Sequence, residues 1–498
     1  MPESNGRPSE ILETGVRNLD RVLGGGLLRR SIVILIGAPG TGKTVLAQEI
    51  AFRSAARGEV ALFLTGFSET HDKLLSHSRG LSFFAPDVVG RGFQFGSLPD
   101  LLREGAEATE EAIIATARAQ RASLVVFDGF RSMRAMLGAE LDAARFLYSV
   151  GAKLALLGAT TLVIIEGDAG NSANYPELTV SDVILTLRHE LRSSHERRLL
   201  EVMKSRGSLA LPGEHPFRIT HDGLQISPHF ESTVMPSDPP LRLEPLSLGV
   251  ADADALLGGG LTAGTCTLAA GNPGVGKTLL GLQFLSSGVR SGEAVLFLGF
   301  MESVAQLRAK ARVFGMDLTA AEANGQLRFL VLPAYDLEAD VIAERIQEDI
   351  ERRGVRRLVI DSAAELERGV HVPNRVPDFL AALVGYLRGK EVTTYLTLDL
   401  PTIVGSPAEF TGAPLSVLAE NLLLLRQVEY RNRLHRVFGV LKMRFSAYDP
   451  GIYEYAIVAG EGMRIRGLAP LGEGLLTGVA RFFGDVSVTQ QRSEGKAD

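Results

Sequence analysis

Short, nearly continuous hydrophobic runs alternate along the chain with longer amphipathic stretches. The runs of the first half are SIVILIG, VALFLTG, SLVVFDG and TTLVIIEG, and those of the second half are CTLAAG, AVLFLGF, RLVIDS and VTTYLTLD. Strands that are hydrophobic throughout are typical of a parallel sheet with both faces covered. We therefore predict an α/β fold in which helices flank mainly parallel sheets.

The same order of features occurs twice. TGVRNLDRVLGGG at residues 14–26 returns as LGVADADALLGGG at residues 248–260. Lys43 and Lys277 lie 234 positions apart, and the offset stays within one residue for later features. Such a constant offset indicates a duplicated domain.

The composition between and after the two copies predicts where the domains end. Residues 227–245 are rich in proline and polar residues, which favours an extended linker. The last residues are polar and predict a disordered tail. We expect a first domain at 1–226, a linker at 227–245, a second domain at 246–486 and a tail at 487–498.

The bulk properties restrict the class of protein. The net charge of −6 gives no electrostatic footprint for binding nucleic acid. The single cysteine, Cys266, excludes an internal disulfide and fits a reducing compartment. The polar start predicts no signal peptide, and the hydrophobic runs are too short to cross a bilayer. We expect a cytoplasmic protein without membrane contact.

Two motifs carry the chemistry. GAPGTGKT and GNPGVGKT both fit the phosphate-loop pattern G-x-x-x-x-G-K-[ST], and each lies between a predicted strand and a predicted helix. The glycines let backbone N–H groups face phosphate oxygens, and the catalytic lysine reaches the β- and γ-phosphates. The predicted ATP-binding residues are Gly37, Gly40, Thr41, Gly42, Lys43, Thr44, Gly271, Gly274, Val275, Gly276, Lys277 and Thr278.

Each copy also has an acid placed to bind Mg²⁺. Asp128 ends SLVVFD and Asp361 ends RLVID, at matching distances from the phosphate loops. Together with the loop threonines Thr44 and Thr278, these acids complete the predicted metal sites. An acid at a strand end is common without a function, but its repetition in both copies favours one.

These features together resemble the KaiC family of RecA-type ATPases. The resemblance covers nearly all of residues 10–470 and includes TGVRNLDRVLGGGL, both phosphate loops, FSET, FMES, RRLLEVMKSRGS and HRVFGVLKMRFS. It implies two tandem RecA-like P-loop NTPase domains. It also implies a homohexamer of two stacked rings, with ATP held between neighbouring subunits.

The resemblance assigns further nucleotide contacts. One Lys–Arg pair near the end of each copy is similar to family residues that reach the γ-phosphate of the next subunit's ATP, and one further arginine lies six residues before each of these lysines. Phe314 matches an aromatic residue that stacks on adenine, whereas the first copy has Leu81 there. Without the resemblance, the charged pairs would be interpreted as solvated strand ends. The assigned cations are Arg198, Lys204, Arg206, Arg436, Lys442 and Arg444.

The catalytic carboxylate departs from the family pattern, which has two adjacent glutamates after the second strand. Here Ser68 precedes Glu69, and Met301 precedes Glu302, so the first carboxylate is missing from both copies. We expect Glu69 to support hydrolysis by orienting the attacking water. Glu302 is the corresponding candidate in the second copy, which could instead serve mainly to bind ATP.

Serine autokinase activity is a second expectation from the resemblance. Ser416 matches a phosphorylated serine of the clock members, but Val417 replaces the adjacent threonine, and Thr411 matches another hydroxyl. Valine cannot accept phosphate, so an ordered two-site cycle is excluded. Ser416 as a phosphate acceptor and Ser416 as an ordinary hydroxyl near a helix start both remain open.

The sequence is compatible with three functions. The first is a slow ATPase whose nucleotide state is read by protein regulators. The second is a DNA-acting recombinase or helicase, which would need basic and aromatic pore loops and fits an acidic chain without tryptophan poorly. The third is a scaffold that needs ATP only to assemble, which the missing glutamates favour.

Overall fold

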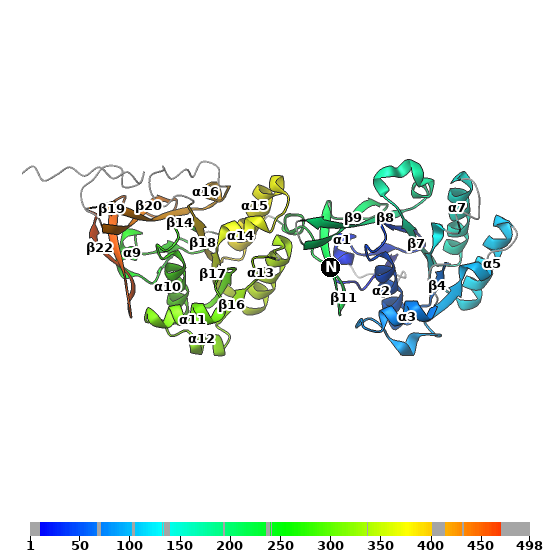
Figure 1. The fold of residues 1–498 in the computed structure, drawn as a ribbon, viewed down its shortest axis with the longest axis horizontal. Helices are drawn as coiled ribbons and strands as arrows, with labels where there is room; N and C mark the ends of the chain where they lie inside the picture. The colour runs from blue at the N-terminus through cyan, green and yellow to red at the C-terminus, as the bar shows by residue number, and fades with distance from the viewer. Residues whose placement is uncertain are drawn as a thin grey trace, which may run out of the picture. The chain divides into compact units, whose positions relative to one another are not determined.

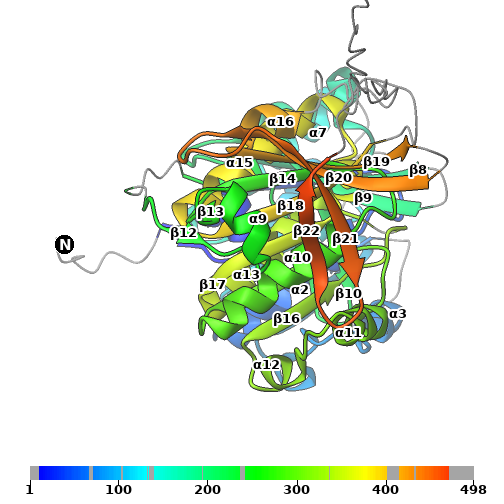
Figure 2. The same ribbon diagram turned by 90° about the vertical axis from the view of Figure 1, so that its left-hand side faces the viewer.

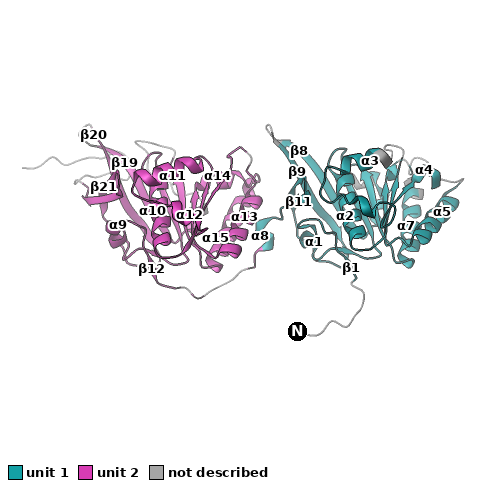
Figure 3. Ribbon diagram, turned by 90° about the horizontal axis from the view of Figure 1, so that it is seen from below, with its two compact units in different colours: residues 1–233 teal, residues 234–498 magenta. Residues whose placement is uncertain are grey.

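The computed structural model describes residues 10–66, 71–101, 105–131, 133, 140–192, 195–235, 240, 242–335, 337–400, 414–430 and 433–469. The chain divides into two compact units, residues 1–233 and residues 234–498 (Figure 3). Each unit contains a nine-stranded, mostly parallel sheet flanked by helices (Figure 1). The predicted α/β fold class with two tandem RecA-like domains is thus confirmed.

The sheet of unit 1 has the strand order β11-β10-β9-β8-β3-β7-β6-β4-β5. The strands from β8 to β5 in this order are parallel, and β8 to β11 form an antiparallel extension. The bounds are β3 (Ile32–Gly37), β4 (Ala61–Thr65), β5 (Phe93–Ser97), β6 (Leu124–Asp128), β7 (Thr160–Glu166), β8 (Val183–Arg192), β9 (His195–Ser205), β10 (Glu214–Thr220) and β11 (Gly223–Ile226).

Unit 2 repeats this topology in the order β16-β15-β17-β18-β14-β19-β20-β21-β22. The phosphate-loop strand β14 again lies between the parallel half and the antiparallel extension. The bounds are β14 (Cys266–Gly271), β15 (Ala294–Gly299), β16 (Leu327–Val331), β17 (Val355–Asp361), β18 (Thr393–Asp399), β19 (Asn421–Tyr430), β20 (Arg433–Met443), β21 (Ile452–Val458) and β22 (Gly462–Leu468).

Helices cover both faces of each sheet. In unit 1 one hydrophobic core lies under α2, and a second lies under α5 and α7. In unit 2, α10 (Figure 1) packs against β14, β15, β17 and β18, while α13 contacts β17 and α15 contacts β18. The longer helices are α2 (Lys43–Ala56), α3 (His71–Ser78), α5 (Ala106–Gln120), α7 (Glu140–Leu156), α10 (Lys277–Arg290), α11 (Val304–Val313), α13 (Ala339–Arg353) and α15 (Val376–Gly389).

Short elements frame the sheets. Those of unit 1 are β1 (Ile11–Leu12), α1 (Leu19–Val22), β2 (Leu27–Leu28), η1 (Pro86–Val88), α4 (Leu98–Leu101), η2 (Ala169–Asn174), η3 (Pro176–Thr179) and α8 (Phe230–Thr233). Those of unit 2 are β12 (Pro245–Leu246), α9 (Ala251–Leu256), β13 (Leu261–Thr262), α12 (Thr319–Ala323), α14 (Ala363–Arg368), η4 (Pro373–Arg375) and α16 (Pro414–Leu418). No helix within the described ranges is long and apolar enough to cross a membrane.

The antiparallel extension ends in a hairpin that returns to the phosphate-loop helix. Figure 2 shows β21 and β22 as this hairpin in unit 2, where β22 contacts α10. Gln283 on α10 accepts a hydrogen bond from the backbone N of Met463 at 3.1 Å. In unit 1, Glu49 on α2 accepts one from the backbone N of Leu224 at 2.8 Å. The hairpin therefore holds the helix whose N-terminus faces the phosphate site.

Candidate active site

The turn from strand to helix in each phosphate loop requires glycine at two positions. Gly271 ends β14, where a Cβ atom would lie 2.1 Å from the carbonyl oxygen of Leu425 on the neighbouring strand. Gly276 has φ 99° and precedes α10, and Gly42 has φ 103° and precedes α2. In each unit, the turn brings the first N–H groups of the helix to the phosphate loop of that unit, which favours phosphate binding there.

Lys277 is buried beneath the phosphate loop of unit 2. Its Nζ donates to the carbonyl oxygens of Gly271 at 2.8 Å and Asn272 at 2.9 Å. It also lies 2.7 Å from Oδ1 of Asp399, so the ammonium group has three acceptors. A phosphate that binds Lys277 must take the place of one of them.

Lys43 occupies the same position in unit 1. Its Nζ donates to the carbonyl oxygens of Gly37 and Ala38, both at 2.8 Å. Burial lowers the pKa of Lys43, while the negative charges of Glu166 and Asp128 act in the opposite direction. A bound phosphate would add negative charge and so favour the protonated lysine further.

The threonine of each loop is hydrogen-bonded to the acid predicted to share its metal ion. Thr44 Oγ1 donates to Asp128 Oδ2 at 3.0 Å, and Thr278 Oγ1 donates to Asp361 Oδ2 at 2.7 Å. A hydroxyl and a carboxylate are hard oxygen ligands of the kind that Mg²⁺ prefers. The residues present therefore fit the metal, which would neutralise charge on the β- and γ-phosphates.

Asp361 is more confined than an ordinary strand-end acid. Burial raises its pKa, and hydrogen bonds from Thr397 and Thr278 act in the opposite direction. The negative charge of Glu302 raises the pKa further, and the positive charge of Lys310 lowers it. The charges of both side chains therefore act on Asp361, the predicted metal ligand.

A cavity of ≈ 450 Å³ opens at the phosphate loop of unit 2. Its walls combine the charged phosphate-site residues with Phe314 and Ile457, so they offer contacts to a polyphosphate and to a planar base. Phe314, which is predicted to stack on adenine, thus lines the cavity at the phosphate loop. The lining residues are Pro273, Gly274, Gly276, Lys277, Thr278, Leu279, Phe297, Gly299, Phe300, Met301, Glu302, Lys310, Phe314, Asp361, Ser362, Glu365, Asp399 and Ile457.

In unit 1 a cavity of ≈ 440 Å³ lies beside Ala38 and Pro39 of the phosphate loop and reaches Glu166 and Tyr175. Leu81, the counterpart of Phe314, is half-buried and packs against the hydrophobic core under α2. A base in this unit would therefore meet different surroundings.

Comparison with known proteins agrees with this geometry. The family model described as the KaiC ATPase matches residues 12–231 and 246–469, one region in each unit. The chain belongs to the KaiC family. Proteins named circadian clock oscillator protein KaiC are 29% identical over 459 residues in Rippkaea orientalis (90% of this chain, 87% of that protein) and 29% identical over 499 residues in Thermostichus vulcanus (96% and 94%). KaiC 1 of Synechocystis is 30% identical over 460 residues (90% and 87%).

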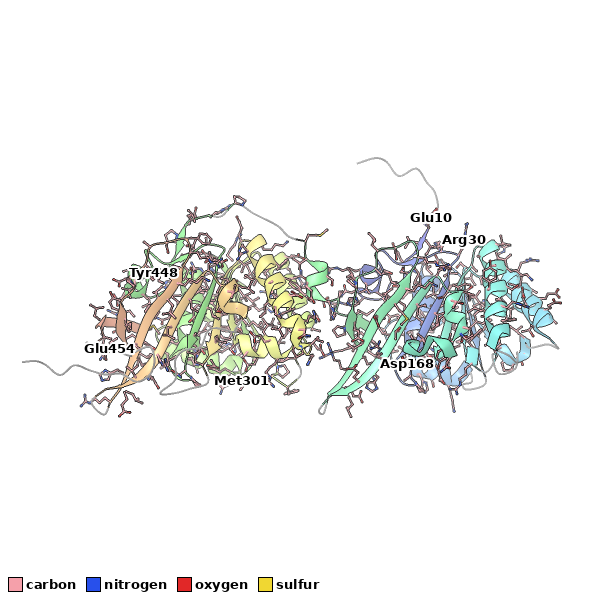
Figure 4. The ribbon with its side chains drawn as sticks, turned by 90° about the horizontal axis from the view of Figure 1, so that it is seen from above. Glu10, Arg30, Asp168, Met301, Tyr448 and Glu454 are labelled. Atoms are coloured by element: carbon pink, nitrogen blue, oxygen red, sulfur yellow. The ribbon has the colours of Figure 1, made fainter. Side chains whose placement is uncertain are left out.

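The departure from the KaiC glutamate pair has a defined structure in unit 2. Met301, labelled in Figure 4, is 75% exposed and lines the cavity. Glu302 also lines it, and its Oε1 accepts a hydrogen bond from Lys310 Nζ at 2.5 Å. The corresponding Ser68 and Glu69 of unit 1 lie outside the described residues.

The Lys–Arg pairs that are predicted to act in trans do not line the cavities beside their own phosphate loops. Lys442 Nζ donates to the carbonyl oxygen of Ala419 at 2.7 Å, and Arg444 Nη2 donates to that of Val417 at 3.3 Å. In unit 1, Lys204 and Arg206 likewise contact the segment before β8. Burial, followed by the neighbouring arginine, lowers the pKa of both lysines.

The two arginines that precede these pairs share an unusual feature. The Nε atoms of Arg198 on β9 and Arg436 on β20 are buried, and neither makes a hydrogen bond among the described residues. Buried donors normally have a partner. The same donor is thus without a described partner at matching positions of both units.

The candidate phosphate acceptor Ser416 is half-buried on α16, while Val417 beside it is 70% exposed. The carbonyl oxygen of Ser416 accepts a hydrogen bond from Lys442 Nζ at 3.3 Å. Thr411 lies outside the described residues. Ser416 does not line the cavity of its own unit, so phosphate transfer to it would need another subunit's ATP.

Sequence reasoning missed the acids that end the strand next to each phosphate loop. Asp399 ends β18 and is paired in register with Gly271, and Glu166 ends β7 and is paired with Gly37. Both copies show an acid at this strand end, so the repeat itself carried the signal. The sequence alone does not show which strand pairs with the phosphate-loop strand, which is β7 in unit 1 and β18 in unit 2.

Proposed function

We propose that this KaiC-family ATPase hydrolyses ATP slowly as a head-to-tail homohexamer and works as a nucleotide-dependent switch for protein regulators. The observation that carries the proposal is that each unit assembles its own lysine, threonine and aspartate at a phosphate loop, while its Lys–Arg pair lies elsewhere. We infer that a neighbouring copy completes such a site through a head-to-tail contact, and a closed ring supplies this contact to every subunit.

In this proposal the residues divide the work by charge. Lys43 and Lys277 bind the β- and γ-phosphates, and the N–H groups at the starts of α2 and α10 surround them. Thr44 with Asp128, and Thr278 with Asp361, hold Mg²⁺, which neutralises phosphate charge. At each site, a Lys–Arg pair of the neighbouring subunit stabilises the charge that develops on the γ-phosphate. The pairs are Lys204 with Arg206 in unit 1 and Lys442 with Arg444 in unit 2.

The two sites are proposed to differ in turnover. In unit 2 the nearest family-like carboxylate, Glu302, already forms an ion pair with Lys310, and Met301 cannot accept a proton. A carboxylate so engaged is less available to orient water. We assign the faster turnover to unit 1, through Glu69, and a slower turnover to unit 2.

Serine autokinase activity is a further part of the proposal. Ser416 lies next to the Lys–Arg pair that would face the neighbouring ATP, because Lys442 contacts its carbonyl oxygen. Val417 limits the modification to one residue at this position. Mass spectrometry after incubation with Mg-ATP tests it, since phosphate on Ser416 must be absent from a Ser416→Ala variant.

The experiment that tests hydrolysis is steady-state phosphate release with Mg-ATP, run beside Glu69→Gln and Glu302→Gln variants. We expect turnover to fall by about 100-fold or more in the unit 1 site when Glu69 is replaced. Loss in the Glu69 variant alone makes unit 1 the faster site. Background-level release from the unmutated protein would contradict the proposal.

A scaffold that binds ATP without hydrolysing it is the second candidate, favoured by the ion pair that occupies Glu302. It predicts ATP-dependent assembly with no phosphate release. Light scattering in ATP and in a non-hydrolysable analogue separates the two, because a scaffold remains assembled indefinitely in ATP whereas a slow ATPase converts its nucleotide to ADP.

A further inference from the structure

Asp399 places a carboxylate inside the phosphate site of unit 2. It ends β18, and its pairing with Gly271 brings it to the carboxyl edge of the sheet, beside the first residue of the phosphate loop. Its Oδ1 lies 2.7 Å from Lys277 Nζ. The side chain is 53% exposed and lines the cavity, whereas the lysine is only 7% exposed.

This ion pair must open when a nucleotide binds. The ammonium of Lys277 has three acceptors, and two of them are backbone carbonyls fixed by the loop. Asp399 is the one acceptor on a side chain that can turn away, so a phosphate oxygen replaces it. Because both the Asp399 carboxylate and the phosphate oxygen that replaces it can reach the same ammonium group, the two oxygens lie within roughly 5 Å of each other. One water molecule can bridge such a gap.

The other acids of the cavity are committed elsewhere. Glu302 is paired with Lys310 at 2.5 Å. Asp361 accepts hydrogen bonds from Thr278 and Thr397 and belongs to the proposed metal site. Glu365 is engaged by Ser362. Asp399 is therefore the carboxylate that nucleotide binding itself releases, at the place where the γ-phosphate arrives.

Unit 1 offers a matched comparison. Glu166 has the same register beside Gly37, but its ion pair there is with Arg131, at 3.6 Å. Glu166 affects Lys43 only as a nearby charge that raises its pKa. Of these two acids, Asp399 is thus the one that forms an ion pair with its phosphate-loop lysine.

We propose that Asp399 is the catalytic carboxylate that orients the attacking water in the unit 2 site, a role that rests on the proposed ATPase function. The water oxygen forms a bond to the γ-phosphorus while the bond to the β–γ bridging oxygen breaks. ADP leaves with that electron pair. Asp399 accepts the water proton and passes it to the inorganic phosphate, so ATP and water give ADP and phosphate.

The test uses the full chain with Lys43→Ala, so that only unit 2 turns over, and compares it with the same chain carrying Asp399→Asn. Phosphate release should slow by about 100-fold. Binding of a fluorescent ATP analogue should stay equal or become a few-fold tighter, because the competitor for Lys277 has lost its charge. A misfolded or merely destabilised variant would instead lose binding.

Three control variants in the same background sharpen the result. Asp399→Glu should recover part of the rate. Glu302→Gln should reduce it less than Asp399→Asn does. Asp378→Asn removes an exposed negative charge from the start of α15, outside the cavity, and should leave both rate and binding unchanged.

The outcomes are distinct. Slow release with retained binding supports the role of Asp399. Retained release in the Asp399→Asn chain, or loss of binding together with release, overturns that role and leaves the proposed hydrolysis intact. No release from the Lys43→Ala parent while it still binds the analogue overturns hydrolysis in unit 2 and the role of Asp399 together.

Discussion

Glu49 and Gln283 occupy the same place in the two units, yet only one of them can be charged. Each side chain ties the phosphate-loop helix to the returning hairpin through one backbone N–H group. Burial raises the pKa of Glu49, while the Leu224 N–H and then Arg53 act in the opposite direction. Gln283 makes the equivalent hydrogen bond without this penalty.

A pH-dependent stability difference follows for Glu49→Gln. The folded-state pKa lies above the unfolded value of about 4.3, so the native chain loses stability as the pH rises through the window between them. Glutamine does not titrate. Above this window, the free energy of unfolding of the variant should therefore rise relative to that of the native chain by about 1.4 kcal/mol per unit of the pKa shift. Urea unfolding between about pH 4 and about pH 8 measures this difference.

The control for this prediction is Glu107→Gln, which replaces an exposed glutamate in the first turn of α5. It should show no such pH-dependent gain. A Glu49→Gln variant that loses stability equally at every pH would show that the ion pair with Arg53 outweighs the burial of the carboxylate.

At the scale of elements, the phosphate loop packs directly against the hairpin of β21 and β22. A Cβ atom on Gly276 would lie 2.9 Å from Ile457 Cδ1 on β21, and the residue has φ 99°. Gly276→Ala should therefore destabilise unit 2 by about 1–3 kcal/mol and also abolish nucleotide binding there, because the N–H groups of α10 change direction.

Gly292→Ala separates these two effects. Gly292 also has a positive φ of 78°, but a Cβ atom there would meet nothing within 4 Å. It should cost about 1 kcal/mol in stability and leave nucleotide affinity unchanged, as measured by thermal unfolding and by titration with a fluorescent analogue. Equal loss of affinity in both variants would mean that general destabilisation, and not the loop geometry, controls binding.

The parallel half of each sheet could be predicted from the sequence because its strands are hydrophobic throughout. The antiparallel pairing of the extension could not, because strands such as β9 carry charged residues along a half-exposed surface, so their pattern shows a strand end without showing its neighbours. The phosphate loops were readable because their chemistry is contiguous in the chain. The contacts of Asp399 with Lys277 and of Glu302 with Lys310 depend on strand order and helix direction, which no local pattern encodes.

At the scale of the whole molecule, the proposed ring makes each site a joint product of two subunits. All subunits carry Lys43→Ala, which inactivates the unit 1 site. Subunits that also carry Lys277→Ala lack a working unit 2 site but can still contribute their Lys–Arg pair to a neighbour. Lys442→Ala/Arg444→Ala subunits retain the site but lend nothing. Each variant alone should be inactive, and an equal mixture assembled together should recover about one quarter of the parent rate, because one interface in four then combines both working parts.

Mixing after separate assembly in ATP is the control, since closed rings of one kind should not recover activity until subunits exchange. Activity of the Lys442→Ala/Arg444→Ala chain on its own would show that these cations are structural and not shared between subunits. Phosphate release over time measures both arrangements.

The position of β14 in its sheet has one more consequence. Its two neighbours are β18, which carries Asp399, and β19, whose antiparallel partner β20 carries Lys442. In register, Lys442 pairs with Leu422, which is level with Leu268, three residues before Gly271. The start of a subunit's own phosphate loop and the backbone of the cation it would lend are therefore two strand spacings across and three residues along the sheet, about 14 Å apart. The tight approach of Gly271 to Leu425 leaves little slack between these strands. In the proposed ring, the state of one site would thus be coupled through a stiff sheet to the next site, and the head-to-tail order of the subunits would give the assembly a direction as well as a state.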